Sequence, residues 1–366
     1  MVCKLAYIYD LKMPFDGTFF YSKNFPNATW EKYESFAEEI HIFPYKQEVE
    51  QTNLNKVTHP QVHFHPLPFP TTKSLYRHLQ KLQSYCRELV KAYDYFVIRL
   101  PSHLGLFVGY ECIRQNKPYL IEAVGNAFEA FYYHGNPIYK VAAPILDRRM
   151  KHVIRHAKTA IYVTNDYLQR CYPNKNTFEV SNATIQLQQE VQRTNTITLG
   201  MIGSLNVKFK GHQTLYKALK LLDDQGYAFT VRLLGEGQYK NELSYRQINV
   251  IHDGLLNKEA LQKWYEQLTI YVQPSITEAN SRSIIEAMSF GIPVVGSTAG
   301  GTPELIEENL LFPVNDAQQL MKKIRLLLDD SQKWEQAAQR NHDFATKYLP
   351  KNVEKARKEA FDHYMN

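Results

Sequence analysis

The sequence predicts an α/β fold built from two Rossmann-like, doubly wound domains. Strand-like apolar segments and helix-like amphipathic segments alternate from end to end, which is typical of a parallel sheet covered by helices. With 366 residues, the chain is longer than one ordinary core requires and suits two domains. A polar, glutamine-rich stretch, residues 180–196, separates two such series and is predicted to be a linker.

The first series indicates an N-terminal domain over residues 1–190. Its predicted strands are Cys3–Tyr9, Ile40–Phe43, Val62–His65, Tyr95–Arg99, Tyr119–Val124 and Ala160–Val163. Its predicted helices are Lys73–Tyr93, Leu104–Gln115 and Ile138–His156.

The second series indicates a C-terminal domain over residues 197–348. Its predicted strands are Ile197–Ile202, Phe229–Leu234, Asn249–Ile251, Ile270–Gln273 and Pro293–Val295. Its predicted helices are Gly211–Leu222, Arg282–Phe290, Ala317–Leu328 and Gln332–Tyr348, and a final amphipathic helix is expected at Lys351–His363. Two such domains present the carboxyl ends of their strands to a common cleft, where ligands bind.

Composition limits the class of protein. An apolar fraction of 44% with 22% charged residues is globular, and the net charge of +6 suits an anionic ligand, an anionic membrane surface or a solvated surface. Charged residues interrupt the N-terminus early, and no uncharged apolar run approaches the ~20 residues that cross a bilayer. We therefore expect a cytoplasmic protein, either free or peripheral on the inner face of the plasma membrane. The aromatic residues do not form a nucleic-acid platform, so no nucleic-acid partner is expected.

No metal site or cofactor is expected. Four scattered cysteines have no metal-ligand spacing and are interpreted as free thiols. The chain contains no Asp-x-Asp, a motif that commonly holds Mn²⁺ or Mg²⁺.

The most informative stretch is residues 274–288, which reads PSITEANSRSIIEAM. Glu278 lies in a loop after a strand, and Glu286 lies about one turn inside the helix that follows. Eight residues at a helical rise separate these glutamates by about 12 Å, which exceeds the roughly 5–9.5 Å of a glycoside hydrolase pair. The spacing suits two hydroxyl-rich groups joined by a pyrophosphate held at the helix N-terminus. The alternative is a surface helix with two solvated glutamates.

Six motifs in the same order resemble the retaining family 4 glycosyltransferases of the GT-B fold, also called glycosyl transferases group 1. The motifs are the Glu278 and Glu286 pair with Ala287-Met288, the strand Gly291-Ile-Pro-Val-Val295, the loop Gly300-Gly301-Thr-Pro-Glu304, the turn at Gly203, the pair Lys210-Gly211, and Leu234-Gly-Glu-Gly237. They cover residues 197–315, and the resemblance is weaker before residue 190.

The resemblance implies roles for these residues. Glu278 would contact the transferred sugar near its reacting carbon, and Lys210 would neutralise the departing pyrophosphate, which makes both catalytic. Glu286 would bind the ribose hydroxyls. The remaining donor-binding residues would be Gly203, Lys208, Gly211, Gly235, Ala279, Asn280, Ser281, Arg282 and Ser283. The alternative for Lys210 is a solvated lysine before a helix. The resemblance also implies that the final segment, residues 349–366, returns to the N-terminal domain.

The sequence departs from the family at two places. An arginine usually follows the glycine turn, and Lys208 or Arg282 would have to supply its charge; Arg282 equally suits a surface capping position. A His-Asp pair usually touches the transferred sugar, where this chain has Gly125 and Asn126. Asn126 is therefore a candidate acceptor-side residue, together with Gly17 and His103. His103 also suits an ordinary loop histidine.

Two basic stretches, residues 73–91 and 148–158, are candidates to rest on an anionic membrane and bring a lipid-linked acceptor to the cleft. Solvated helix faces are the alternative.

The sequence thus predicts a retaining, metal-independent hexosyltransferase. Its donor would be a UDP- or GDP-type sugar, and its acceptor a glycan, a lipid-linked saccharide or a protein in cell-surface glycan assembly. The alternative is a non-catalytic GT-B partner subunit that stabilises an active glycosyltransferase. A sugar-nucleotide epimerase lacks an acid/base set in the sequence.

Overall fold

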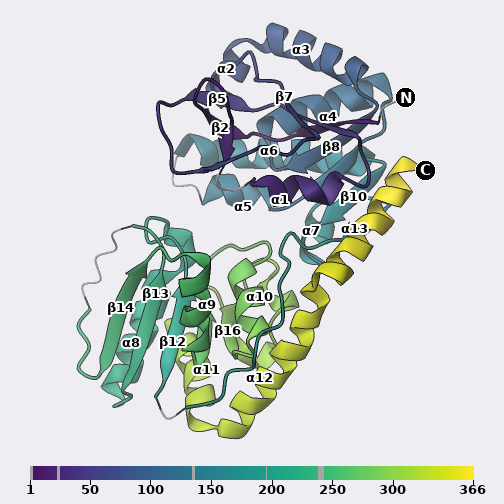
Figure 1. Ribbon diagram of the computed structural model, residues 1–366. Helices are drawn as coiled ribbons and strands as arrows, with labels where there is room; N and C mark the ends of the chain where they lie inside the picture. Colours follow the sequence, from purple (N-terminus) through teal and green to yellow (C-terminus); the bar gives the residue numbers. More distant parts are fainter. Residues whose placement is uncertain (1–2, 23–24, 134–136, 195, 238–242) are drawn as a thin grey trace. The chain divides into compact units, whose positions relative to one another are not determined.

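The computed structural model describes residues 3–22, 25–133, 137–194, 196–237 and 243–366. The chain forms two compact units (Figure 1). The first consists of residues 1–163, 168–180 and 354–366, and the second of residues 164–167 and 181–353.

The first unit contains a seven-stranded parallel sheet in the order β11-β10-β9-β8-β1-β4-β7. Its strands are β1 (Lys4–Ile8), β4 (Glu39–Ile42), β7 (Val62–Phe64), β8 (Tyr95–Leu100), β9 (Leu120–Ala123), β10 (Thr159–Tyr162) and β11 (Thr177–Glu179). Its helices are α1 (Asn27–Trp30), α2 (Thr72–Arg77), α3 (Leu79–Ala92), α4 (His103–Gln115), α5 (Ala127–Tyr132) and α6 (Pro137–His156). The short helix α7 (Tyr167–Cys171) and the long helix α13 (Pro350–Met365) belong partly to each unit.

The second unit contains a six-stranded parallel sheet in the order β14-β13-β12-β15-β16-β17. Its strands are β12 (Thr198–Ile202), β13 (Phe229–Leu234), β14 (Ile248–Gly254), β15 (Ile270–Gln273), β16 (Val294–Ser297) and β17 (Leu311–Phe312). Its helices are α8 (His212–Asp224), α9 (Lys258–Glu266), α10 (Arg282–Ser289), α11 (Ala317–Asp329) and α12 (Ser331–Ala345).

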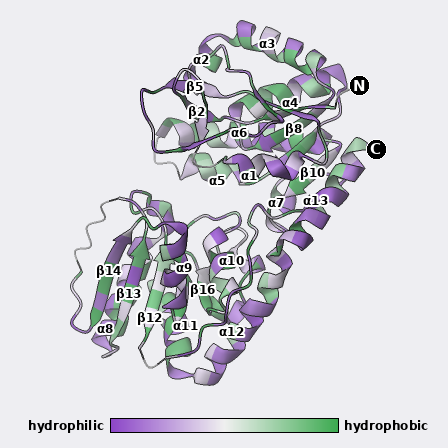
Figure 2. Ribbon diagram, in the orientation of Figure 1, coloured by the Kyte–Doolittle hydropathy of each residue, from purple (hydrophilic) through white to green (hydrophobic). Residues whose placement is uncertain are grey.

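The sheets form because their strands are apolar runs buried on both faces, as expected of parallel sheets covered by helices. Every residue of β9, β10, β15 and β16 is buried. Figure 2 shows the contrast, with β8 mainly hydrophobic and α13 mainly hydrophilic. The predicted fold class, two Rossmann-like α/β domains, is confirmed.

One predicted helix needs correction, and several elements were not predicted. The expected helix Lys73–Tyr93 is two helices, because the backbone of His78 leaves the helical region (φ −124°, ψ 50°) between α2 and α3. Helix α9 was not predicted; it begins after Asn257, whose side chain caps it by accepting a hydrogen bond from the Ala260 amide. Two small accessory sheets were missed as well, β2 (Lys12–Phe15) with β5 (Tyr45–Glu48), and β3 (Tyr21–Ser22) with β6 (Asn55–Lys56).

The predicted linker is packed onto the second unit. The Ile185 amide donates to the Tyr348 carbonyl at 3.0 Å, and the Gln188 amide donates to the Ser289 carbonyl at 3.0 Å. Residues 181–190, which the sequence analysis placed in the first domain, therefore belong to the second unit. Asn195, inside the same predicted linker, lies outside the described residues.

Candidate functional site

The donor-side motifs gather at the carboxyl ends of β12, β13 and β15. These strands are parallel neighbours, so the residues that follow them meet at one edge of the sheet. The Gly203 amide donates to the Leu234 carbonyl at 2.9 Å. A Cβ on Gly235 would lie 2.1 Å from the Gly203 carbonyl oxygen, so the turns after β12 and β13 are in direct backbone contact.

Lys210 and Glu278, the two predicted catalytic residues, form an ion pair. The Lys210 Nζ lies 2.8 Å from Glu278 Oε2, and both side chains are largely shielded from solvent, with 25% and 14% exposed. Lys210 ends a 3-10 turn that begins at Lys208. A Cβ added to Gly203 would lie 3.2 Å from the Cβ of Lys210, so the two residues are close neighbours. Lys208 is exposed, whereas Lys210 is largely shielded and paired with Glu278, so the two lysines have different surroundings.

Gly211 allows β15 to approach the start of α8. Its φ is +79°, and a Cβ at this position would lie 1.8 Å from the Pro274 carbonyl oxygen. Glycine is therefore required both for the backbone angle and for the close contact.

Replacing Gly211 with alanine should destabilise the protein by more than the roughly 1–2 kcal/mol that a left-handed backbone costs an ordinary residue. Gly226 is a matched control, because its φ is +87° and a Cβ there would meet nothing within 4 Å. Urea unfolding of both variants should show a clearly larger loss of unfolding free energy for Gly211→Ala. Equal losses would mean that the Pro274 contact carries no cost.

A chain of buried polar groups holds Glu278. Glu278 Oε2 accepts a hydrogen bond from the Ser275 hydroxyl at 3.3 Å, and that hydroxyl accepts one from Gln273 Nε2 at 2.7 Å. Gln273 Oε1 in turn accepts from the Tyr271 hydroxyl at 2.9 Å. Gln273 and Ser275 are completely buried, so the carboxylate is oriented from inside the domain.

The N-terminus of α10 lies next to this chain of polar groups. Ser281 is the N-cap residue, and its hydroxyl lies 3.1 Å from the Ser283 hydroxyl, which donates to Gln273 Oε1 at 3.2 Å. Among the described residues, no side chain caps this helix through its N-cap position. Its N-terminal amides and its dipole could therefore interact with an anion, and the donor-binding role of residues 279–283 stays a prediction.

Glu286, inside α10, has a different partner from Glu278. Its Oε2 accepts a hydrogen bond from the Tyr265 hydroxyl at 2.9 Å. Burial raises the pKa of Glu286 above its ordinary value, although Tyr265 and Arg282 act in the opposite direction. Glu286 and Tyr265 help to line a hollow of about 440 Å³ with Lys258 and Gln262. Arg282 is exposed one helical turn before Glu286.

The two glycines of the GGTPE loop bring it against the backbone of Glu278 and Ala279. The Gly301 amide donates to the Glu278 carbonyl at 3.0 Å. A Cβ on Gly300 would lie 1.8 Å from that carbonyl oxygen, and a Cβ on Gly301 would lie 2.1 Å from the Ala279 oxygen. This loop thus fixes the backbone of Glu278, the glutamate predicted to be catalytic.

Glu304, at the end of that loop, has a role that the sequence analysis did not assign. Its carboxylate accepts hydrogen bonds from the backbone amides of Asn165, Asp166 and Tyr167, a segment that belongs to the second unit. Charged acceptors make strong bonds to backbone amides, so Glu304 anchors this segment.

Several other site residues escaped the sequence analysis. Gln273, Ser275 and Tyr265 orient the two glutamates, and His212 is buried beside Gly203. Burial lowers the pKa of His212 to about 4, against the hydrogen bond with the Gly203 backbone, so the ring is neutral at pH 7. Of these residues, only Gln273 could have been singled out from the sequence, because it is a polar residue at the end of an apolar strand. A polar residue that is buried usually has a specific role.

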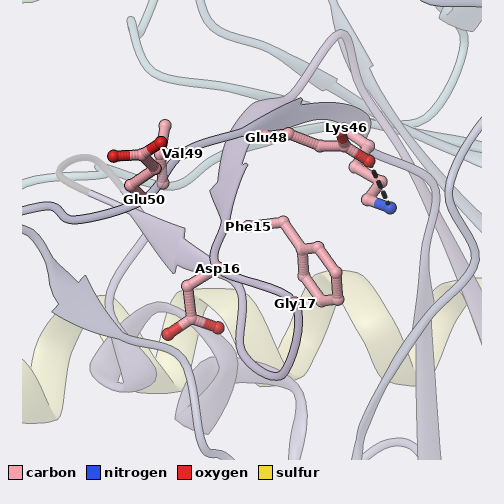
Figure 3. A pocket seen from close by; sticks show the side chains of 7 residues that line it. All are labelled: Phe15, Asp16, Gly17, Lys46, Glu48, Val49 and Glu50. Atoms are coloured by element: carbon pink, nitrogen blue, oxygen red, sulfur yellow. Dashed lines mark ion pairs between the residues drawn. The ribbon is translucent and has the colours of Figure 1, made fainter.

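The candidate acceptor-side residue Gly17 lines a hollow in the first unit. The hollow has a volume of about 450 Å³ and is bordered by Phe15, Asp16, Gly17, Lys46, Glu48, Val49 and Glu50 (Figure 3). Gly17 has a φ of +99°, and no atom lies within 4 Å of where its Cβ would be. Hydrogen bonds from Tyr21 and from the Phe19 and Thr18 amides lower the pKa of Asp16 to about 2.

The other two acceptor-side candidates occupy helix N-termini in the first unit. The His103 amide donates to Asp10, and its Nδ1 lies 2.7 Å from the Tyr76 hydroxyl. Burial lowers the pKa of His103. Asn126 caps α5 by accepting from the Glu129 amide at 3.2 Å, and it also accepts from the Tyr172 hydroxyl at 3.0 Å. Both residues therefore have structural contacts, and their acceptor role stays a prediction.

Within the described residues, no three His, Cys, Asp or Glu side chains are grouped so as to hold a metal ion. The same residues include no helix that is long and apolar enough to span a membrane.

The part of the chain that holds the candidate site resembles known proteins. A family model described as "Glycosyl transferases group 1" matches residues 196–330, the part that holds Lys210, Glu278 and Glu286. Protein CapJ from Staphylococcus aureus is 30% identical over 373 residues, covering 99% of this chain and 95% of CapJ. The chain belongs to the group 1 glycosyltransferases. A putative colanic acid biosynthesis glycosyltransferase, WcaL from Escherichia coli, is 30% identical over 130 residues, 31% of this chain and 32% of WcaL.

Solved structures show that this glycosyltransferase has the GT-B fold. A sucrose-phosphate synthase from Thermosynechococcus elongatus matches with a TM-score of 0.72 at 16% identity, covering 99% of each chain. HepE from Anabaena, solved in complex with UDP, matches with a TM-score of 0.66 at 16% identity, covering 98% of each chain. Membership in the group 1 glycosyltransferases and the GT-B fold are thus confirmed, whereas family 4, retention, metal independence and the hexose stay predictions.

Proposed function

We propose that this glycosyltransferase moves a hexose from a nucleoside diphosphate sugar to a hydroxyl acceptor, with retention and without a metal ion. The observation that carries the proposal is the shielded ion pair between Lys210 and Glu278 beside the N-terminus of α10. It combines a cation, an anion and a helix dipole in one place.

Lys210 would stabilise the departing diphosphate. An ammonium group has three donors, and the hydrogen bond to Glu278 uses one of them. The others suit phosphate oxygens, on which negative charge grows in the transition state. Stabilising such charge is often the greatest single contribution that an enzyme makes to its rate. The α10 N-terminus would hold the same phosphates through Ala279, Asn280, Ser281, Arg282 and Ser283.

Glu278 would bind the transferred sugar and Glu286 the ribose. The two carboxylates have separate partners, Lys210 and Ser275 for Glu278, and Tyr265 for Glu286. Separate surroundings suit two ends of one donor better than a shared proton transfer. In this proposal, the leaving diphosphate takes the proton of the incoming hydroxyl.

The relatives support the donor class and the setting. HepE has been solved in complex with UDP-glucose, and WcaL is named for colanic acid biosynthesis. We therefore propose a UDP- or GDP-sugar donor and an acceptor of a growing cell-surface glycan.

The test is to incubate the protein with UDP-glucose, UDP-galactose and GDP-mannose, with hydroxyl acceptors and with or without EDTA. We expect nucleoside diphosphate release with one donor, unchanged by EDTA, and an α-linked product identified by the one-bond carbon–proton coupling at its anomeric position. A β-linked product would contradict retention, and loss of activity restored by Mg²⁺ would contradict metal independence. No release from a folded protein with any nucleotide sugar would favour the non-catalytic partner subunit.

A further inference from the structure

Helices α5 and α6 of the first unit expose an unusual number of large hydrophobic side chains. Six of them occur within 18 residues, here called the α5–α6 apolar patch: Phe128, Tyr132, Tyr133, Ile138, Val141 and Ile145. The three aliphatic members are 73%, 75% and 61% exposed. Their spacing along α6 is three and four residues, which places them on one face of the helix. The opposite face, with Leu146, Met150 and Val153, is buried.

The exposed face of α6 changes character along its length. The aliphatic residues occupy its first half, and Arg148, His152 and Arg155 continue the same face in the second half at helical spacing. The two halves meet in a hollow of about 520 Å³ that Ile145, Arg148 and His152 help to line. An apolar surface therefore leads directly into a cationic one.

The charge of this helix has one sign where it faces solvent. Its 20 residues include five Lys and Arg but one acidic residue, Asp147. Asp147 is 16% exposed and is already bound, by Lys151 at 2.7 Å and by the Tyr172 hydroxyl at 2.7 Å. Helix α6 therefore offers no further carboxylate to Arg148 and Arg155, and an anionic partner would have to come from outside the helix.

The aromatic members extend the patch. Phe128 and Tyr132 stack with ring centroids 5.2 Å apart, and Lys140 Nζ lies 5.4 Å from the centroid of the Tyr132 ring. Aromatic rings and long cationic side chains with apolar stems both favour the boundary between water and lipid.

These observations distinguish two kinds of partner. A second copy of this chain would bring an equally cationic helix to the interface and supply no carboxylate from its own α6 face. An anionic lipid surface offers acyl chains to the aliphatic residues and phosphates to the arginines at once.

The other predicted basic stretch does not share this arrangement. On α3, Lys91 pairs with Glu88 at 3.0 Å, and Lys81 lies 5.6 Å from the centroid of the Phe69 ring. Leu79 is the one large hydrophobic residue of α3 described as exposed. Of the two stretches, α6 therefore carries the apolar component.

We propose that the α5–α6 apolar patch and the cationic half of α6 form a docking surface for an anionic phospholipid bilayer. Ile138, Val141 and Ile145 enter the acyl boundary, while Arg148 and Arg155 contact lipid phosphates. The proposal goes beyond sugar transfer and does not depend on it.

The test is co-sedimentation of the full chain with vesicles of phosphatidylcholine containing about one third phosphatidylglycerol, compared with phosphatidylcholine alone. We expect binding to the anionic vesicles that weakens as salt is raised. Exchanging Ile138, Val141 and Ile145 together for serine should lower the partition coefficient by on the order of tenfold or more. Leu255→Ser is the matched control, because Leu255 is 64% exposed in the second unit, and it should leave binding unchanged.

A second variant, Arg148→Gln with Arg155→Gln, should flatten the salt dependence. Thermal melting should be unaltered in all variants, because the changed side chains are exposed. Absence of binding by the unaltered protein would overturn the proposal, as would equal binding to neutral vesicles. Light scattering measures the oligomeric state of the unaltered protein and of the triple variant. If the triple variant changes the oligomeric state and not vesicle binding, the patch is an interface between copies of the chain and the proposal is overturned.

Discussion

Replacing Lys210 with methionine is expected to lower kcat by on the order of a hundred- to a thousandfold, with the donor KM changed much less. The ammonium lies 2.8 Å from Glu278 in a largely shielded position, so solvent cannot replace it at the departing diphosphate. Steady-state kinetics with the donor that supports nucleoside diphosphate release measures the effect. Because methionine keeps much of the length of the side chain, the loss reflects charge more than packing.

Two variants make that result interpretable. Lys217→Met removes an exposed lysine from α8 and should leave kcat unaltered. Lys208→Met tests whether the neighbouring lysine supplies the charge of the missing family arginine; a loss that approaches that of Lys210→Met would show that it does. If Lys210→Met retains full turnover while its melting temperature is unchanged, the catalytic role of Lys210 is wrong.

Replacing Arg357 with methionine is expected to lower the free energy of unfolding by about 3–5 kcal/mol, because it leaves a buried carboxylate short of a partner. Arg357, from the middle of α13, lies 3.1 Å from Glu122 Oε1, and the two side chains are 4% and 2% exposed. Arg99 reaches the other oxygen at 3.3 Å, and Tyr33 donates at 2.8 Å. Urea denaturation followed by tyrosine fluorescence or circular dichroism measures the loss.

The pH dependence has a defined sign. Burial alone raises the pKa of Glu122, but Arg357, Arg99 and Tyr33 outweigh it and hold the pKa below its ordinary value of 4.5. A carboxyl group whose pKa is lowered by folding stabilises the fold at pH values above its ordinary pKa. This stabilisation is lost as the pH falls through the lowered pKa. Acid should therefore destabilise the unaltered protein more steeply than Arg357→Met.

Lys358→Met provides the control on the same helix. Lys358 pairs with Asp362 at 2.7 Å, but both side chains are more than half exposed, so the change should cost no more than about 0.5 kcal/mol. Similar losses for the two variants would show that the buried pair at Glu122 adds no stability.

The sequence predicted the sheets and the donor-side motifs because their signals are local. Strands such as β15 and β16 are apolar runs of four residues, and the glutamate motif reads the same in any context. It did not predict α9, β2 or the break at His78, because short elements and single backbone angles depend on tertiary contacts. The sequence placed the end of the first domain at residue 190 and not at residue 180. The polar residues 181–190 bind to the second unit through backbone hydrogen bonds, which composition does not reveal.

The sequence by itself determined the fold class and the group 1 glycosyltransferase family, and it singled out Lys210, Glu278 and Glu286 as candidate site residues, since residue types at fixed spacing carry that information. The tertiary structure alone decided how these residues are arranged. It brought Lys210 to Glu278 across 68 positions of the chain, and it placed Gln273 and Ser275 behind the carboxylate. It also gave Glu286 a different hydrogen-bond partner, Tyr265. Hydrogen bonds form between neighbours in space, and only folding determines which neighbours a buried polar group acquires.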